Sequence, residues 1–396
     1  MIKDSDLFCG DDPGSVKVST ATGLRRRNSQ AVLDALLADG PRAGGELMTA
    51  TGLSRPTVHE ICDDLIVRGL AVEEAAPPGA GPGRRPRVYA ARADAAHVVG
   101  VDMGESTVRA VVADLRGVVV GEALAAFDDP RTPVARRLGQ VRATVAEALG
   151  AAGVPVERVL AAALGVPAPV TADGHALAVD AYLPGLTPVD LRTALAPLPL
   201  IVENDADLAV LAERWLGAAV DCADAVLLLA GERLGAGICV GGRLVRGRSG
   251  GAGEMGFLHL VEGVGAPDGI GRLLRRATGL PAPDALAAAA RGERAALDAL
   301  DAVAERAGRV LAILATLLDP QVIVLGGAIA AAGDVLMGPL RRAYGGALRE
   351  RPLRATPALA ASPLAERGTV LGAVRVALDD LVPRLIDLGP AGATMG

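Results

Sequence analysis

The sequence predicts an α/β protein in which a small helical domain with a short β-hairpin precedes a larger region of two similar α/β lobes. Three observations carry this prediction: a helix-turn-helix pattern near the N-terminus, a proline- and glycine-rich stretch at residues 76–83, and an internal duplication in the rest of the chain. A chain of 396 residues also exceeds one ordinary hydrophobic core, so more than one domain is expected.

The expected boundaries follow from these patterns. Residues 1–20 are expected to form a flexible tail, residues 21–92 the small α+β domain, and residues 93–396 the two-lobed region. Within that region we expect lobe 1 over about residues 93–201 together with the C-terminal helix, and lobe 2 over about residues 202–375.

Composition excludes several classes of protein. Hydrophobic residues make up 51% and aromatic residues 2%, so a disordered chain is excluded and the cores should consist of Ala, Val and Leu. No uncharged run of about 18 apolar residues occurs, and the acidic start lacks an apolar segment, so we expect neither a membrane span nor a secretory signal. None of the four cysteines forms a CxxC pair, so we expect reduced thiols and a cytoplasmic protein.

The net charge of −6 excludes a protein that coats nucleic acid along its whole length. The charge is uneven, however, because residues 13–92 hold 11 basic and 8 acidic side chains, a surplus of +3. This surplus coincides with the helix-turn-helix pattern.

The helix-turn-helix pattern occupies residues 46–65. Gly52 permits the tight turn between the two helices, Ser54 is a natural N-cap, and Pro56 fits the first turn of the second helix. An apolar stripe follows at helical spacing, formed by Val58, Ile61, Cys62 and Leu65. The outward face should then present Arg55, Thr57, His59, Glu60 and Asp63.

Two short strands after this helix resemble a wing, at residues 70–73 and 86–90, with a basic segment between them. A recognition helix and a basic wing together favour DNA binding over a structural helical domain with solvated arginines. The predicted DNA contacts are Arg55, Pro56, Thr57, His59, Glu60, Arg84, Arg85 and Arg87. Glu60 and Asp63 would repel phosphates, so either Glu60 accepts a hydrogen bond from cytosine or the helix relies on Arg55 and His59.

The larger region contains the same pattern twice. Each copy predicts a buried strand, a glycine-bearing turn, a second strand, a tight hairpin and a third strand, over residues 97–120 and 225–246. Alanine-rich helices follow both copies, at residues 133–150 and 283–318. Two such lobes are typical of the actin-like, sugar-kinase-like ATPase fold, in which the cleft between the lobes is the default ligand site.

Four motifs of this region resemble those of the ROK family (repressors, open reading frames and kinases). They are DMGES at 102–106, VENDAD at 202–207, RG at 246–247 with GGAGEMG at 250–256, and DP at 319–320 with VLGG at 324–327. The resemblance covers about residues 24–380, and the winged helix in front resembles the transcriptional-repressor branch of the family. It implies a relative of sugar-responsive repressors and of bacterial glucokinases.

The candidate effector-binding residues are Asn204, Asp205, Glu254, Phe257 and His259. Asp205 follows a short strand and opens a helix, where it could accept a proton from a sugar hydroxyl or simply cap the helix. The resemblance implies that Asp205 is a kinase base, that Asn204 and Asp205 contact sugar, and that Glu254 does so too. Phe257 stands where the family has a histidine, and His259 either compensates or is an ordinary histidine.

Other family features are missing. The segment 261–274 lacks the cysteines that hold a structural zinc in the family, so we expect no metal, and Leu274 aligns with a second sugar-binding glutamate. The two glycine turns that would bind phosphates carry Glu105 and Glu232, and Arg233 is available to pair with Glu232. We therefore expect no ATP binding, no kinase activity and no cofactor.

The sequence thus predicts a DNA-binding transcriptional regulator, most simply a repressor, whose second domain senses a sugar and mediates oligomerisation. A single helix-turn-helix makes few base contacts, so a homodimer or homotetramer on a double-stranded operator is expected. The alternatives are a ROK-type carbohydrate kinase, and a regulator that has lost its sugar and responds to another partner.

Overall fold

The computed structural model describes residues 21–75, 86–129, 131–177, 183, 185–186, 189–255, 261–265, 268–349 and 355–387. The chain divides into two compact units, Met1–Ala93 with Pro383–Gly396, and Asp94–Val382. Both mix helices and strands, which confirms the predicted α/β class. No described helix combines the length and the hydropathy that a membrane span requires.

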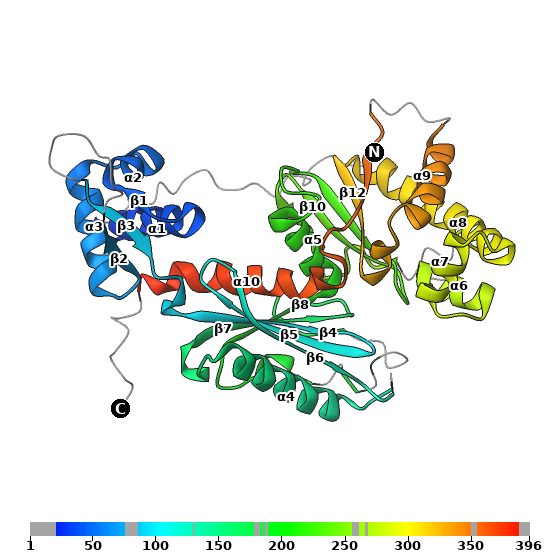
Figure 1. Ribbon diagram of the computed structural model, residues 1–396, viewed down its shortest axis with the longest axis horizontal. Coiled ribbons are helices and arrows are strands. Elements are labelled where there is room, and N and C mark those ends of the chain that lie inside the picture. The colour runs from blue at the N-terminus through cyan, green and yellow to red at the C-terminus, as the bar shows by residue number, and fades with distance from the viewer. Residues whose placement is uncertain are drawn as a thin grey trace, which may run out of the picture. The chain divides into compact units, whose positions relative to one another are not determined.

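The described residues 21–75 and 86–93 of the first unit form three helices and a small sheet (Figure 1). The helices are α1 (Ala21–Asp39), α2 (Gly44–Thr51) and α3 (Arg55–Val67). The strands β1 (Arg42–Ala43), β2 (Ala71–Glu74) and β3 (Val88–Ala91) lie in the order β1-β3-β2, and both pairs are antiparallel. This is the predicted winged helix-turn-helix.

The local signals that predicted α3 are confirmed. Gly52 adopts the left-handed conformation (φ 70°) that ends α2, and the Ser54 side chain accepts a hydrogen bond from the Thr57 amide at 3.5 Å. The apolar stripe packs inward, with Val58, Ile61, Cys62 and Leu65 all buried.

The end of the C-terminal helix also belongs to the first unit. Arg26 forms an ion pair with Asp387 at 2.8 Å, and Arg68 donates to the carbonyl of Ile386 at 2.8 Å. We expected the whole C-terminal helix to belong to lobe 1, but the residues from Pro383 onward belong to the first unit. The hydrogen bond from Arg68 satisfies a carbonyl at the helix end, where intrahelical donors are missing.

Lobe 1 of the second unit is a five-stranded sheet in the order β6-β5-β4-β7-β8. The strands β4 (His97–Met103), β5 (Thr107–Asp114) and β6 (Val119–Ala126) form the predicted antiparallel meander. The strands β7 (Val159–Val166) and β8 (Leu200–Asn204) extend the sheet in parallel beside β4. Helix α4 (Val134–Ala152) packs on the meander. Short 3₁₀ turns lie at Ala93–Ala95, Val156–Arg158 and Leu191–Thr193.

Lobe 2 repeats this topology with the order β11-β10-β9-β12-β13, which confirms the duplication. Its strands are β9 (Ala225–Leu229), β10 (Gly235–Val240), β11 (Arg243–Leu244), β12 (Val322–Gly326) and β13 (Ala358–Ala361). Its helices are α6 (Ile270–Thr278), α7 (Ala282–Ala290), α8 (Arg294–Leu318) and α9 (Asp334–Leu348), and 3₁₀ turns lie at Ala328–Ala332 and Ala365–Arg367. Gly292, at a φ of 82°, separates α7 from α8 within the predicted alanine-rich segment.

Helices α5 (Asp205–Leu216) and α10 (Gly368–Leu385) pack closely in the second unit (Figure 1). A Cβ atom at Gly372 would overlap the carbonyl of Leu208 in α5, and one at Gly237 in β10 would overlap the carbonyl of Ala206. A Cβ at Gly100 in β4 would lie 2.6 Å from the carbonyl of Val370 in α10. Glycine is therefore required where α5 and α10 meet each other and the sheets.

Replacing Gly372 by alanine should destabilise the second unit by about 1–3 kcal/mol, because the added methyl group must displace the α5 backbone. Thermal and urea unfolding followed by circular dichroism measure this change. The matched control is Gly139→Ala in α4, where the added Cβ meets nothing within 4 Å. That variant should be stabilised by about 0.5–1 kcal/mol, because alanine loses less backbone entropy in a helix. Equal stability of the two variants would contradict the packing argument.

Candidate functional site

The exposed face of α3 is the candidate DNA interface. Arg55, Pro56 and Glu60 are exposed, and Thr57 is half-buried beside the Ser54 cap. Glu60 lies 3.1 Å from Arg25 of α1, so its charge is paired. Arg84 and Arg85 lie outside the described residues.

His59 does not face outward as predicted. Its Nδ1 atom lies 2.6 Å from the hydroxyl of Tyr89, which is fully buried in β3. The ring also lies close to Gly44, where a Cβ would be 3.0 Å from the His59 Cε1 atom. A buried tyrosine hydroxyl needs a hydrogen-bond partner, and this requirement turns His59 toward the wing.

Arg87 is also engaged within the unit. Its guanidinium lies 2.6 Å from Asp63 of α3 and 2.7 Å from Glu73 of β2, and it lies 5.1 Å from the centre of the Tyr89 ring. The hydrogen bonds to Asp63 and Glu73 raise the pKa of Arg87 above its ordinary value. Arg87 therefore joins the recognition helix to the wing, and it offsets the negative charge of Asp63 that would oppose DNA.

The second unit contains a pocket of about 790 Å³ lined by residues of both lobes. It brings together three of the predicted effector residues, Asn204, Asp205 and Glu254. Phe257 and His259 lie outside the described residues. Leu274 does not line this pocket, because it is 1% exposed in the hydrophobic core of lobe 2. The expectation that Leu274 lies at the sugar site is therefore wrong.

The carboxyl groups of Asp102, Asp205 and Glu254 are among those that line this pocket, and all three have raised pKa values. Burial, together with the charge of Asp205, raises the pKa of Asp102 to about 7, against the lowering effect of Arg109. Burial likewise raises the pKa of Asp205 to about 6 and raises that of Glu254, while the charge of Arg233 lowers both. Hydrogen-bond donors from a ligand would relieve this concentration of acidic groups.

Asn204, rather than Asp205, caps α5. Its side-chain oxygen accepts hydrogen bonds from the amides of Ala206 at 2.9 Å and Asp207 at 3.1 Å, and its Nδ2 donates to the carbonyl of Ala168 at 3.0 Å. The N-cap, which the sequence offered as an alternative role for Asp205, is thus Asn204. The cap leaves the Asp205 carboxyl at the first helical position, on the pocket wall.

Glycines position the loop that carries Glu254. Gly250 and Gly253 adopt φ angles of 75° and 81°, and a Cβ at either position would overlap a backbone carbonyl, that of Val170 or that of Ala236. The loop therefore lies directly against lobe 1 on one side and strand β10 on the other. This close approach holds the Glu254 side chain at the pocket.

The two glycine turns present acidic side chains that arginines neutralise. Glu232 lies 2.5 Å and 2.6 Å from the two terminal nitrogens of Arg275, and 3.2 Å from the Nε of Arg272. Arg272 also lies 3.9 Å from Glu105 of the other turn. The sequence offered Arg233 as a partner for Glu232. In the structure Glu232 contacts Arg272 and Arg275 of α6, and Arg233 donates to the carbonyl of Pro167 at 3.3 Å.

The turn that carries Glu105 is fixed from behind by a buried arginine. The side chain of Arg137, which is 1% exposed, donates to the carbonyls of Thr132, Gly104 and Glu105 at 3.0, 3.0 and 2.9 Å. Its guanidinium also stacks 4.2 Å from the centre of the Phe127 ring. The position of Glu105 is therefore set by lobe 1 itself.

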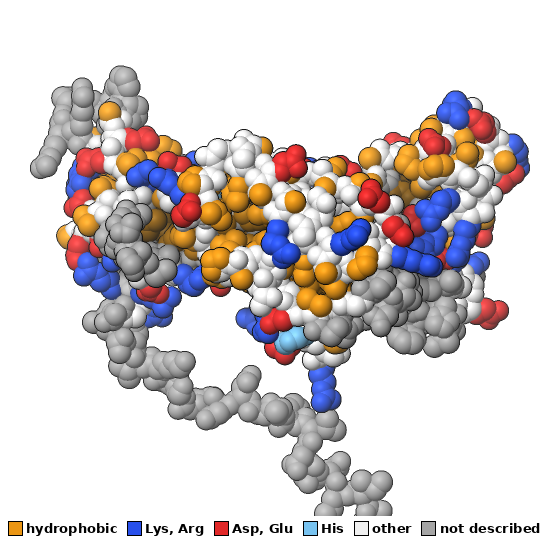
Figure 2. Space-filling model, turned by 90° about the horizontal axis from the view of Figure 1, so that it is seen from below, with side chains coloured by type: hydrophobic (Ala, Val, Ile, Leu, Met, Phe, Trp, Pro, Cys, Tyr) orange, Lys and Arg blue, Asp and Glu red, His pale blue; other side chains and the backbone are white. Residues whose placement is uncertain are grey.

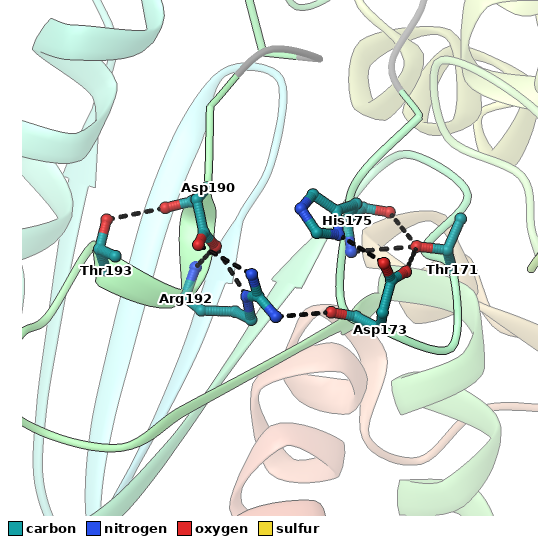
Figure 3. A network of polar contacts seen from close by, with 6 residues as sticks. All are labelled: Thr171, Asp173, His175, Asp190, Arg192 and Thr193. Carbon is teal, nitrogen blue, oxygen red and sulfur yellow. Dashed lines mark hydrogen bonds and ion pairs between the residues drawn. The ribbon is translucent and has the colours of Figure 1, made fainter.

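A network of polar contacts joins the hairpin at Thr171–His175 to the turn at Asp190–Thr193 in lobe 1 (Figure 3). His175 Nδ1 lies 3.0 Å from Asp173, and the amide of His175 donates to the Thr171 hydroxyl at 3.1 Å. Arg192 joins this hairpin to the next turn by donating to the carbonyl of Asp173 at 3.0 Å and to Asp190 at 2.8 Å.

Several residues of the site were missed by the sequence prediction. Asp102 is the last residue but one of β4, within the DMGES motif. A charged residue near the end of a buried strand was the signal that could have found it. Behind the pocket, Arg246 pairs with the buried Glu203 at 2.6 Å, and Asp207 is 3% exposed. Burial, with the charge of Glu203, raises the pKa of Asp207 to about 8. Within the described part of the chain, no group of three or more His, Cys, Asp or Glu side chains is arranged to hold a metal.

Comparisons with known proteins agree with this architecture. The xylose repressor of Caldicellulosiruptor bescii is 23% identical over 398 residues, which cover 91% of this chain and 98% of that protein. The glucokinase of Halalkalibacterium halodurans is 32% identical over 178 residues, which cover 37% of this chain and 54% of that enzyme. The chain thus matches only about half of the length of that enzyme.

A solved structure shares the fold of the whole chain. It is a ROK family transcriptional regulator, a homologue of the Escherichia coli MLC protein, with a TM-score of 0.73 and 22% identity over 92% of this chain and 100% of that chain. The model of the ROK family itself matches residues 98–380. This chain therefore belongs to the ROK family.

Proposed function

We propose that this chain is a DNA-binding transcriptional repressor whose second unit binds a sugar in the pocket between its lobes. The observation that carries the proposal is the full-length match to the xylose repressor, which includes the winged helix-turn-helix that precedes the two lobes. The match to the glucokinase covers only 37% of this chain.

The described geometry of the first unit supports DNA binding. Arg55 and Pro56 are exposed in the first turn of α3, which is the part of a recognition helix that reaches base edges. The acidic Glu60 and Asp63 are each paired with an arginine, which reduces their repulsion of phosphates. A single winged helix contacts one half-site, so we further propose that the protein binds its operator as a dimer or tetramer.

The pocket supports a sugar as the effector. Asp102, Asp205 and Glu254 supply acceptors for sugar hydroxyls, and Asn204 keeps the loop at Ala168 in place. A bound sugar needs paired donors and acceptors that offset the loss of its hydration. A regulator that has lost its sugar and responds to another partner is the alternative, and a panel of pentoses and hexoses tested by thermal shift distinguishes the two.

Phosphoryl transfer is not part of the proposed function. Glu105 and Glu232 stand in the two turns that would hold nucleotide phosphates, and Arg272 joins them. Carboxylates beside a triphosphate oppose its binding. Without a bound triphosphate there is no phosphoryl donor for a sugar hydroxyl that Asp205 would deprotonate.

DNA binding should depend on Arg55. Its replacement by alanine should weaken binding to a fragment from upstream of the gene about tenfold, because a bidentate base contact contributes roughly 1–3 kcal/mol. Fluorescence anisotropy at two salt concentrations measures the affinity. Arg294→Ala, which removes the same charge from a side chain that is 88% exposed in the second unit, should change it less than twofold. Unchanged affinity in a chain without residues 1–92 would refute the assignment.

Effector response should depend on Asp205 and Glu254. In Asp205→Ala and in Glu254→Ala, the concentration of sugar that releases DNA should rise at least tenfold, because each change removes an acceptor from the pocket. The control Glu147→Ala alters an exposed acidic residue of α4 and should respond as the wild type does. An unchanged response in both pocket variants would place the effector elsewhere.

The purified protein should not phosphorylate glucose with ATP above the rate of a blank. A coupled assay for ADP release over a range of hexoses measures this activity. Turnover that is abolished by Asp205→Asn would establish the carbohydrate kinase instead.

A further inference from the structure

The charges that line the pocket are predominantly negative. Of the described residues that line it, the acidic ones are Asp102, Glu105, Asp205, Glu213, Glu232, Glu254 and Glu366, and the basic ones are Arg109 and Arg233. A ligand in this pocket therefore meets mainly carboxyl groups, which accept hydrogen bonds from hydroxyl or ammonium groups and repel anions.

Both arginines of the wall already face acidic groups of the protein. Arg109 forms ion pairs with Glu122 and with Glu366, the latter at 2.7 Å, and its side chain is 12% exposed. The charge of Arg233 acts on Asp205 and Glu254, whose pKa values it lowers. Neither arginine adds a positive charge that exceeds the acidic charge around it.

The arginines behind the wall are likewise directed at acidic groups. Arg275 donates two hydrogen bonds, of 2.5 Å and 2.6 Å, to the two carboxyl oxygens of Glu232. This is the bidentate geometry in which arginine binds a phosphate or a carboxylate. Arg272 contacts Glu232 at 3.2 Å and Asp268 at 3.5 Å, and Arg276 also pairs with Asp268. Figure 2 shows arginine and acidic side chains gathered together at the end of the second unit that carries α6 and α7.

Glu232 thus occupies the position that an anionic ligand would need. Its backbone packs against the start of α6. The carbonyl of Glu232 accepts a hydrogen bond from the amide of Gly269 at 3.0 Å, and a Cβ at Gly269 would overlap the carbonyl of Gly231. A phosphate that takes the same contacts with Arg272 and Arg275 must displace Glu232 from both. The carboxyl group therefore acts as an internal competitor for any phosphorylated ligand.

We propose that the pocket binds an unphosphorylated sugar, either uncharged or bearing an amino group, and that Glu232 is the residue that excludes sugar phosphates. This inference rests on the proposed function, because it specifies the class of effector at the same site. It assigns to Glu232 a role in specificity rather than in catalysis.

The test compares matched pairs of ligands. Glucose, glucosamine and N-acetylglucosamine are each titrated beside the corresponding 6-phosphate, with calorimetry on the full-length protein and DNA release as readouts. The wild type should bind at least one unphosphorylated sugar at least tenfold more tightly than its 6-phosphate. Tighter binding of a 6-phosphate would overturn this inference and leave the proposed function intact, whereas no binding and no DNA release with any of the six would overturn both.

The variant Glu232→Gln tests the mechanism of exclusion. It should bind the 6-phosphates at least tenfold more tightly than the wild type does, because Arg272 and Arg275 lose their competing carboxylate. The control Glu147→Gln removes the same charge from the exposed face of α4 and should leave phosphate affinity unchanged. If Glu232→Gln fails to fold by circular dichroism, Glu232→Ala provides the same test, because it also removes the carboxylate from Arg272 and Arg275. Unchanged phosphate affinity in a folded variant would refute the role of Glu232.

Discussion

The close packing of α5 against β10 and α10 is the constraint on which the pocket depends. Helix backbones can approach at this distance only where a glycine replaces a side chain, at Gly237 beside Ala206 and at Gly372 beside Leu208. The same helix begins at Asn204, whose cap fixes the first turn and places Asp205 on the pocket wall. A change in the packing of α5 would therefore also move the carboxyl group of Asp205 on the pocket wall.

The charges of the pocket residues determine which ligands the pocket favours. The pocket contains carboxyl groups whose burial raises their pKa values, because burial destabilises the charged form. Hydrogen-bond donors from a ligand would stabilise that charged form. The arginines nearby do not supply those donors to a ligand in the described structure, since Arg275 is directed to Glu232 and Arg109 to Glu366. The chain thus keeps the two-lobed fold that it shares with kinases while its charges favour hydroxyl groups over phosphates. Fold and ligand class are set by different residues.

The sequence was sufficient wherever the determining interactions are local. Gly52, the Ser54 cap and the apolar stripe of α3 act within a few residues of one another, and the strands of both meanders follow from runs of apolar residues bounded by glycine turns. It was insufficient where the partner lies far along the chain. Periodicity places His59 on the outer face of α3, but it lies instead against the buried hydroxyl of Tyr89. Arg137 is buried because two carbonyls of a distant turn, those of Gly104 and Glu105, require donors. Leu274 was misplaced for a related reason, because a loop without the family's cysteines offers no fixed point for an alignment.

A regulator of this kind must connect its pocket with its DNA-binding unit, and the chain passes between the two units twice, after Ala93 and after Val382. The second passage lies within α10. The first residues of this helix, Gly368 and Thr369, line the pocket, and the Thr369 hydroxyl donates to the carbonyl of Asp205 at 3.3 Å. Its end is bound within the first unit by Arg26 and Arg68. A ligand changes DNA affinity only if it prefers one of two states of the protein. Helix α10 begins beside Asp205, at the site where a sugar would bind. A sugar that prefers one position of the start of α10 would therefore couple the pocket to the DNA-binding unit.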